Sequence, residues 1–381
     1  MRCGVNDPLA WRGRIRQPGA RRSISLAAAL SLFYWGCAPA SPAPETDEPS
    51  DVWSAGPPLP TPITNNAVAA VETTEGISVF SFLGLDASKK WSGVTNAAFR
   101  WNVGEAAWRE IEPVPGPGRL ASTAQVIDGL IYVVGGYTVA EDGTERSVPD
   151  VNVYDPVAES WSRAPDIPVP TDDAVAGVWR GTHIVLVSGW HDDGNVPDVQ
   201  LFEPASGRWT SGTPIPGNPV FGHTGAVVGD RIVYVDGTVM SDVAPRFSIE
   251  ASSWEGVLDG SDPTHISWTR VAQHPGPPLY RAGGASVGNF ALFAGGADNP
   301  YNYDGLGYDG VPSQPLRQLL AWGPGASAWR YLPAPPIASM DHRNLGTAAS
   351  RVFLVGGMIA NQEVTARVWM ADIEALFASV F

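Results

Sequence analysis

Residues 119–136 read RLASTAQVIDGLIYVVGG, two apolar runs that flank Asp128-Gly129 and end in a pair of glycines. An Asp-Gly dipeptide between alternating apolar runs is a strong signal for a β-hairpin. A polar loop over 138–149 leads to another alternating run and then to a last one that carries Trp161. The segment 118–165 therefore predicts a four-stranded antiparallel sheet, which buries its faces only if further sheets stack against it.

The same pattern recurs along the chain. The glycine pair, intact or altered, occurs at six sites: Leu83-Gly84, Gly135-Gly136, Ser188-Gly189, Asp236-Gly237, Gly295-Gly296 and Gly356-Gly357. A late-strand tryptophan recurs in phase with it, at Trp53, Trp108, Trp161, Trp209, Trp268 and Trp329. Steps of roughly 50 to 60 residues are the period of kelch propeller blades. The sequence resembles the kelch-repeat family over nearly everything after residue 50.

This resemblance implies an all-β fold, a six-bladed kelch-type β-propeller formed by residues 51–381. We expect the tryptophans to pack one sheet on the next, and the glycines to adopt positive φ where a Cβ would clash. Trp53 carries the signature of a last strand, but no earlier strands of its blade precede it in the chain. An N-terminal strand is therefore expected to complete the last blade and close the ring. A rival closure uses residues 374–381 as that strand. Residues 251–263 are predicted to be an insertion in blade 4.

Residues 1–37 have a basic region that ends at Arg21-Arg22 and an apolar run that leads to Gly36-Cys37. This pattern predicts a signal peptide, and the run is too short for a stable membrane span. The end of the run is similar to a bacterial lipobox, which implies acylation of Cys37 as the first residue of the mature chain. Cleavage after Ala38 or Ala40, or an Arg-Arg-dependent export signal, are the alternatives.

Residues 38–50 are rich in Pro and Ala and predict a stiff spacer between a membrane surface and the globular domain. We therefore expect an exported protein, periplasmic or at the cell surface, that is anchored by lipid. The formal net charge is −15, and six arginines but one acid lie in the leader. The remainder carries about −20, a charge that repels phosphate backbones and anionic head groups. Nucleic acid is therefore excluded as a partner, and membrane contact is expected only through the anchor.

Kelch propellers bind ligands on the face where the loops after the glycine pairs meet the loops that lead into each blade. The candidate ligand-binding residues on that face are Ser122, Tyr137, Trp190, His191, His223, Arg246, Arg281, Asn299, His342 and Arg343. We expect five of them to line a central funnel, namely Ser122, His223, Arg281, His342 and Arg343, with aromatic side chains beside it. Asn299 belongs to the loop 298–310, whose tyrosines and amides suit a sugar.

Structural roles are the alternatives for these residues. Arg281 can tie neighbouring blades by donating hydrogen bonds to backbone carbonyls, and His223 can be a satisfied buried imidazole. The loop 298–310 can pack on itself. The six histidines show no paired spacing on one element, so no metal site is expected. Galactose oxidase also has kelch blades, but its copper site needs a tyrosine crosslinked to cysteine. No cysteine follows Cys37, so that cofactor cannot form, and no other cofactor is expected.

Blade 5, with Phe293–Ala297 followed by a Tyr/Asn-rich loop, is similar to that of the periplasmic sialic acid (N-acetylneuraminate) mutarotases, which are six-bladed kelch proteins. In that family a glutamate soon after the blade 4 glycine, with an arginine a few residues on, is implicated in anomer exchange. Arg246 matches the arginine, whereas Thr238 stands near the place of the glutamate. Asp242 and Glu250 are the candidate substitutes for the missing carboxylate.

The favoured hypothesis is a non-enzymatic, lipid-anchored propeller that binds a small polar, carbohydrate-like ligand or a protein partner through the funnel face. The alternative is a sugar mutarotase or epimerase that uses the same funnel, and a third hypothesis is a scaffold that uses only its outer loops. Arg281 and Arg343 distinguish these functions. Convergence of both on a carboxylate favours the enzyme, and a funnel filled by apolar side chains favours the scaffold.

Overall fold

The computed structural model describes residues 52–74, 76–326 and 328–378. The predicted leader, Cys37 and the spacer lie outside the described residues, so their assignments stay predictions. Nearly all regular structure in the described part is β-strand. The exceptions there are the 3-10 turns η1 (Trp91–Gly93) and η2 (Ala360–Gln362) and the helix α1 (Ile373–Ala378).

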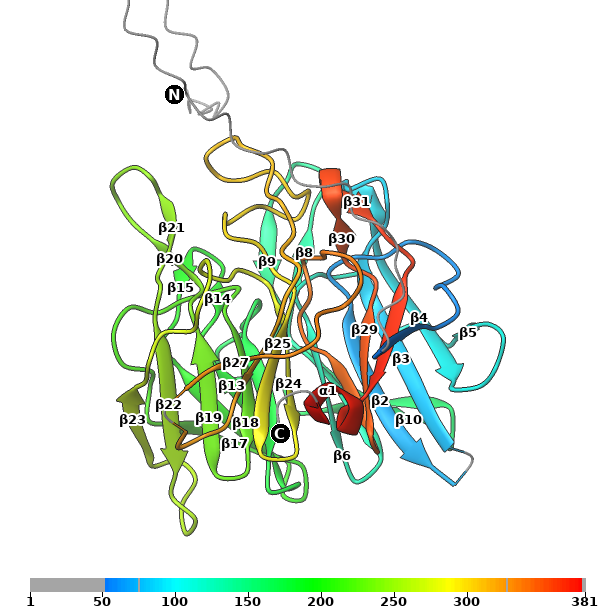
Figure 1. Cartoon of the computed structure of the whole chain (residues 1–381), viewed down its shortest axis with the longest axis horizontal. Helices are drawn as coiled ribbons and strands as arrows, with labels where there is room; N and C mark the ends of the chain where they lie inside the picture. The colour runs from blue at the N-terminus through cyan, green and yellow to red at the C-terminus, as the bar shows by residue number, and fades with distance from the viewer. Residues whose placement is uncertain (1–51, 75, 327, 379–381) are drawn as a thin grey trace, which may run out of the picture. The chain divides into compact units, whose positions relative to one another are not determined.

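Six four-stranded antiparallel sheets form the blades of a β-propeller (Figure 1). Blade 1 contains β2 (Ala67–Thr73), β3 (Gly76–Leu85), β4 (Val94–Asn102) and β5 (Arg109–Ile111). Blade 2 contains β6 (Thr123–Ile127), β7 (Leu130–Val134), β10 (Val151–Asp155) and β11 (Ser160–Ala164). Blade 3 contains β12 (Val175–Trp179), β13 (His183–Val187), β16 (Val199–Glu203) and β17 (Arg208–Gly212).

Blade 4 contains β18 (Thr224–Val228), β19 (Arg231–Val235), β22 (Ser253–Leu258) and β23 (Ile266–Arg270). Blade 5 contains β24 (Gly283–Val287), β25 (Phe290–Ala294), β26 (Leu319–Trp322) and β27 (Arg330–Tyr331). Blade 6 contains β28 (Gly346–Ala348), β29 (Arg351–Val355), β32 (Val368–Asp372) and β1 (Trp53–Ala55). The prediction of an insertion over 251–263 is wrong in part, because residues 253–258 are the third strand of blade 4.

The blades close into a ring. The innermost strands β2, β6, β12, β18, β24 and β28 each contact the next one, and β28 returns to β2. The prediction of a six-bladed all-β propeller is therefore confirmed. These strands carry small side chains toward the axis, and the channel they enclose has a volume of about 410 Å³.

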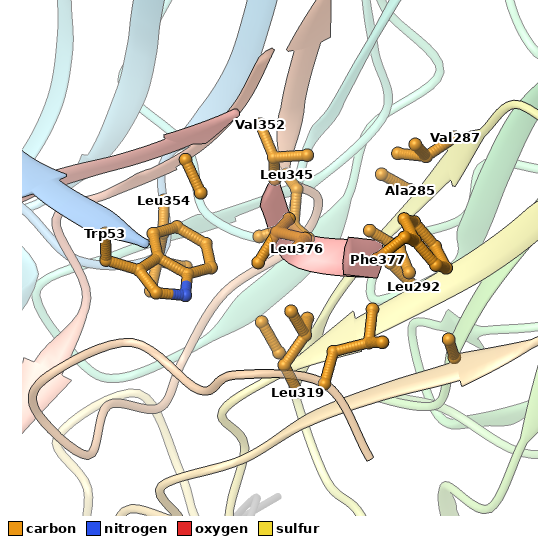
Figure 2. Close-up of a cluster of buried hydrophobic side chains, with 14 residues drawn as sticks. Trp53, Ala285, Val287, Leu292, Leu319, Leu345, Val352, Leu354, Leu376 and Phe377 are labelled. Atoms are coloured by element: carbon orange, nitrogen blue, oxygen red, sulfur yellow. The ribbon is translucent and has the colours of Figure 1, made fainter. Parts of the chain in front are cut away.

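The N-terminal strand closes the ring, as predicted. β1 pairs antiparallel with β32, with Trp53 opposite Ala371, and becomes the outer strand of blade 6. The rival closure is wrong, because residues 373–378 form α1 instead of a strand. Figure 2 shows Leu376 and Phe377 of this helix in the apolar cluster between blades 5 and 6, to which Trp53 also belongs. Both ends of the domain are thus held by one core.

The repeated tryptophans join neighbouring blades. The indole N–H of each donates to a backbone carbonyl of the segment that follows the preceding blade, over 2.6 to 3.3 Å. The pairs are Trp53 with Pro333, Trp108 with Pro57, Trp161 with Glu112, Trp209 with Pro165, Trp268 with Thr213 and Trp329 with Ala272. Each tryptophan thus satisfies its own N–H while it ties its blade to the preceding one.

Short hairpins extend four blades on one side of the ring, at the top of Figure 1. They are β8 (Tyr137–Val139) with β9 (Glu145–Ser147), β14 (Trp190–His191) with β15 (Gly194–Asn195), β20 (Thr238–Met240) with β21 (Phe247–Ile249), and β30 (Met358–Ile359) with β31 (Glu363–Val364). In blade 5 the irregular loop 297–318 takes this place. We call this side the hairpin face.

Candidate functional site

The residues that begin the six blades form a ring around the propeller axis, which we call the hub ring. Its members are Asn65, Ala121, Asp173, Gly222, Arg281 and Asp341, and each has a left-handed φ between 48° and 66°. Hydrogen bonds join neighbours around the ring, and the last of them uses the amide of His342. The left-handed region costs most side chains about 1–2 kcal/mol, so the closed ring must hold this shared conformation in place.

Four charged side chains meet at the hub ring, and we call Asp173, Arg281, Asp341 and Arg343 the hub cluster. Arg281 Nη2 lies 2.6 Å from Asp173 Oδ2, and its Nη1 lies 3.3 Å from Asp341 Oδ1. Arg343 Nη2 lies 3.1 Å from Asp173 Oδ1 and 3.4 Å from Asp341 Oδ1. Each side chain is at most 4% exposed. Two cations face two anions, so the cluster has no net charge.

The pKa of Asp173 reflects this pairing. Burial alone would raise the pKa of its carboxyl, but the guanidinium groups of Arg281 and Arg343 outweigh burial and hold the pKa below its usual value. The rings of Tyr280 and Tyr301 also lie against the Arg281 guanidinium, at 4.9 and 5.3 Å. Arg281 and Arg343 thus converge on carboxylates, the arrangement predicted from the sequence to favour the enzyme. The paired charges also fill the predicted funnel, and neither arginine is free to balance the charge of a ligand.

A pocket of about 120 Å³ lies on the hairpin face of the hub cluster, and we call it the hairpin pocket. Its walls come from blade starts, from three hairpins and from the blade 5 loop. The lining residues are Tyr137, Glu145, Asp172, Asp173, Trp190, Phe221, Phe247, Arg281, Asn302 and Tyr308. An engineered cavity of roughly 150 Å³ holds benzene, so the hairpin pocket admits one small ring or a compact head group.

One wall of the hairpin pocket is aromatic. The ring of Trp190 lies 5.2 Å from that of Phe221 and 6.0 Å from that of Phe247. Tyr308 reaches over from the blade 5 loop and packs its ring 4.2 Å from Phe247 of blade 4. The edge-to-face and tilted geometries are those that aromatic quadrupoles favour. The loop 298–310 therefore packs onto a neighbouring blade and supplies part of the site.

The lining also carries two carboxyl groups, those of Glu145 and Asp172, and the backbone of Asp172 pairs with that of Trp190. Asp172 is 3% exposed, and its Oδ2 accepts a hydrogen bond of 2.5 Å from the Ser147 hydroxyl. Burial raises the pKa of both carboxyls, and the neighbouring Asp173 raises that of Asp172 further. Carboxyls with raised pKa values in a cleft are candidates for functional groups.

Three of the ten predicted residues line the hairpin pocket: Tyr137, Trp190 and Arg281. Arg343 lies beside them in the hub cluster. Three others are buried in internal hydrogen bonds. Ser122 donates to the carbonyl of Gly135, His223 pairs with the carbonyl of Val187, and His342 pairs with the hydroxyl of Ser339. Burial lowers the pKa of each histidine to about 4, which leaves both neutral at pH 7.

The remaining three predicted residues lie outside the lining. Asn299 donates within its own loop to Asp309 and to the carbonyl of Val311. His191 follows Trp190 in β14, and Arg246 lies 5.5 Å over the ring of Phe247. Asp242 and Glu250, the candidate substitutes in the mutarotase comparison, do not line the pocket either.

Seven lining residues are not among the predicted site residues: Glu145, Asp172, Asp173, Phe221, Phe247, Asn302 and Tyr308. Asp172 could be found only as a neighbour of the hub, and Asn302 and Tyr308 only as members of the unusual loop 298–310. Glu145 carried no signal beyond its place in a polar loop after a glycine pair. Among the described residues, no group of three or more side chains could hold a metal ion. No helix in that part of the chain is long and apolar enough to span a membrane.

Comparison with known proteins agrees with this architecture. A family model described as Kelch motif matches residues 118–168. An F-box/kelch-repeat protein of Arabidopsis thaliana is 30% identical over 24% of this chain and 23% of its own length. Kelch-like protein 15 of Gallus gallus is 26% identical over 40% of this chain and 30% of its own length.

These matches thus span less than a third of the length of either relative. A solved structure titled "Structure of YjhT" superimposes with a TM-score of 0.64 at 16% identity, over 81% of this chain and 94% of that one. At that identity the likeness concerns the fold.

Proposed function

Because the chain is a kelch-repeat β-propeller, we propose that it binds a small polar, carbohydrate-like ligand in the hairpin pocket. The observation that carries this proposal is the pairing of an aromatic wall with a carboxyl wall in one concave site. Aromatic faces stack on the C–H faces of a ring, and carboxyl and amide groups bind its hydroxyls. The neutral hub cluster forms the floor.

A binding experiment tests this function. Tyr308→Ala removes a ring from the aromatic wall, and Tyr331→Ala removes a 55% exposed ring from an outer strand as the control. We expect a sugar that stabilises the protein to lose about tenfold in affinity with Tyr308→Ala, which is about 1.4 kcal/mol. Tyr331→Ala should leave the affinity unchanged. Equal effects of the two substitutions, in calorimetric titrations of neutral, amino and acidic monosaccharides, would contradict the site.

A second candidate function is mutarotation of a bound sugar, and the raised pKa values of Glu145 and Asp172 favour it. Ring opening needs a base for the anomeric hydroxyl proton and an acid for the ring oxygen. Ionised Glu145 would take the proton and protonated Asp172 would supply one, and ring closure on the other face would return both. NMR of a freshly dissolved single anomer measures the rate. Glu145→Gln should abolish any acceleration, and the exposed Glu141→Gln should not.

We also propose that the protein is exported and anchored through a lipid on Cys37. The support is the sequence of residues 1–50, a basic and apolar leader followed by Gly36-Cys37 and a Pro/Ala spacer. Metabolic labelling with palmitate should mark the wild-type protein and not Cys37→Ser, and the variant should leave the membrane fraction. Equal labelling of the two proteins would refute the anchor and would leave the pocket untouched.

A further inference from the structure

The charges around the hairpin pocket do not balance. Arg281, the one cation in its lining, is already paired with Asp173 and Asp341. Within the described part of the chain, neither Glu145 nor Asp172 forms an ion pair. Asp172 Oδ1 accepts no hydrogen bond there either, although the side chain is almost fully buried. Because the charges within the hub cluster cancel one another, the pocket keeps two carboxyls without a counter-charge.

The aromatic part of the lining suits a cation as well. Rings of Trp190, Phe221 and Phe247 surround one side of the pocket, with Tyr308 above Phe247. The negative faces of aromatic rings attract ammonium groups within about 6 Å, most strongly where water is excluded. Carboxylates together with aromatic rings suit the recognition of a quaternary ammonium group, because the rings contact the methyl groups and the carboxylates balance the charge.

We propose that the hairpin pocket selects a cationic ligand, one whose ammonium or methylated ammonium group contacts both the carboxyls and the aromatic wall. The proposal rests on the proposed function and names its ligand class. The volume of about 120 Å³ fits such a head group, with the rest of the ligand directed toward solvent. Burial raises the pKa of both carboxyls more than the paired Arg281 lowers it, and a bound ammonium group would favour their charged forms.

The opposite ligand class is disfavoured by the same geometry. An anionic sugar would need a free guanidinium group, yet both nearby arginines share the same two buried aspartates. The overall charge of −15 also concentrates cations near the surface and repels anions. Charge therefore distinguishes the ligands that this site can accept from those it rejects.

The test compares three probes of one shape in calorimetric titrations of the full chain. Choline carries the positive charge, 3,3-dimethylbutan-1-ol is its neutral carbon isostere, and 3,3-dimethylbutanoate carries a negative charge. We expect choline to bind at least tenfold more tightly than the isostere, and the anion not to bind. Equal binding of choline and the isostere, or tighter binding of the anion, overturns the proposal.

Variants locate the effect. Glu145→Gln keeps the shape of the side chain and should weaken choline at least tenfold without changing the affinity of the isostere. Glu141→Gln removes an exposed charge from the same hairpin and is the matched control. Loss of choline binding in both variants would assign the effect to general surface charge and refute the site. If a neutral sugar binds in a Tyr308-dependent way and choline does not bind, the proposal of a cationic ligand is wrong and the proposed binding function stands. If neither a probe nor a sugar binds, the cationic ligand and the proposed binding function are both wrong.

Discussion

The substitution Asp341→Asn tests the hub cluster most directly, because it removes one charge and little else. Asp341 has a φ of 66°, and asparagine is among the side chains that tolerate this region. Four donors reach its Oδ1: Asn65, Arg281, Tyr301 and Arg343. Asparagine keeps that oxygen and these four hydrogen bonds while the carboxylate charge is lost. Its amide nitrogen replaces the Oδ2 that accepts from the Thr64 hydroxyl, so this hydroxyl must rotate and accept instead.

The expected cost follows from burial. Loss of one partner from a buried ion pair costs about 3–5 kcal/mol, and we expect about 3 kcal/mol because Asp173 still pairs with both arginines. Unfolding entropy of about 2.1 cal/mol/K per residue over roughly 330 residues gives about 0.7 kcal/mol/K, so Tm should fall by about 4 °C. Scanning calorimetry measures this shift.

Two comparisons make that result interpretable. Asp166→Asn breaks a pair with Arg163 in which both side chains are more than half exposed, so it should cost less than about 1 kcal/mol. Arg343→Gln added to Asp341→Asn restores neutrality and should recover part of the loss, which a double-mutant cycle reports as coupling. A Tm shift for Asp341→Asn as small as that for Asp166→Asn would refute the argument that the hub cluster is a desolvated charge network.

Three further predictions concern stability. Trp53→Ala, at a 2% exposed position that closes the ring, should cost about 3–5 kcal/mol in denaturant unfolding, whereas the 42% exposed Trp91→Ala should cost less than about 1 kcal/mol. Gly136→Ala places a Cβ 2.3 to 2.5 Å from other atoms at a φ of 97° and should cost about 3 kcal/mol; Gly129→Ala, with open space around it, should cost only about 1 kcal/mol. Burial lowers the pKa of His342 to about 4, while the unfolded chain takes up that proton near pH 6.5. Stability should therefore be lost as pH falls from 7 toward 4, by about 3 kcal/mol for this group, and His342→Gln should flatten the pH dependence of Tm; an unchanged slope would contradict it.

The architecture could be predicted because its determinants are local and repeated. Each Asp-Gly or glycine-pair turn and each late tryptophan acts within one blade or on the adjacent one, so the period alone predicts the number of sheets. The closing strand followed from Trp53, which had no blade of its own. Blade 4 was harder, because its third strand, Ser253–Leu258, contains Gly256 and lacks clean alternation. The blade period predicted the sheet of blade 4 correctly, whereas the local sequence of this strand did not reveal it.

The site could be predicted only in part, because its pairings cross the ring. Asp173 and Arg281 are 108 residues apart in the chain, and no spacing rule links them. The sequence therefore placed two arginines near the axis, but nothing in it paired them with Asp173 and Asp341. It gave no reason to prefer Glu145 over other acids of its loop, since the short hairpin that directs it to the pocket is polar and without periodicity.

The division of roles between hub and hairpins has a consequence for how this propeller can vary. The hub ring and hub cluster are buried and charge-balanced, so changes there alter folding stability before they alter binding. The hairpins β8–β9, β14–β15 and β20–β21 contribute pocket walls while their strands lie outside the six blade sheets. We call the hub and the hairpins two layers. When a substituted hub residue and a substituted hairpin residue share no partner, their effects on the free energy of unfolding should add, as they do for distant sites. If Glu145→Gln lowered Tm by as much as Asp341→Asn, the two layers would be one network and this separation would be wrong.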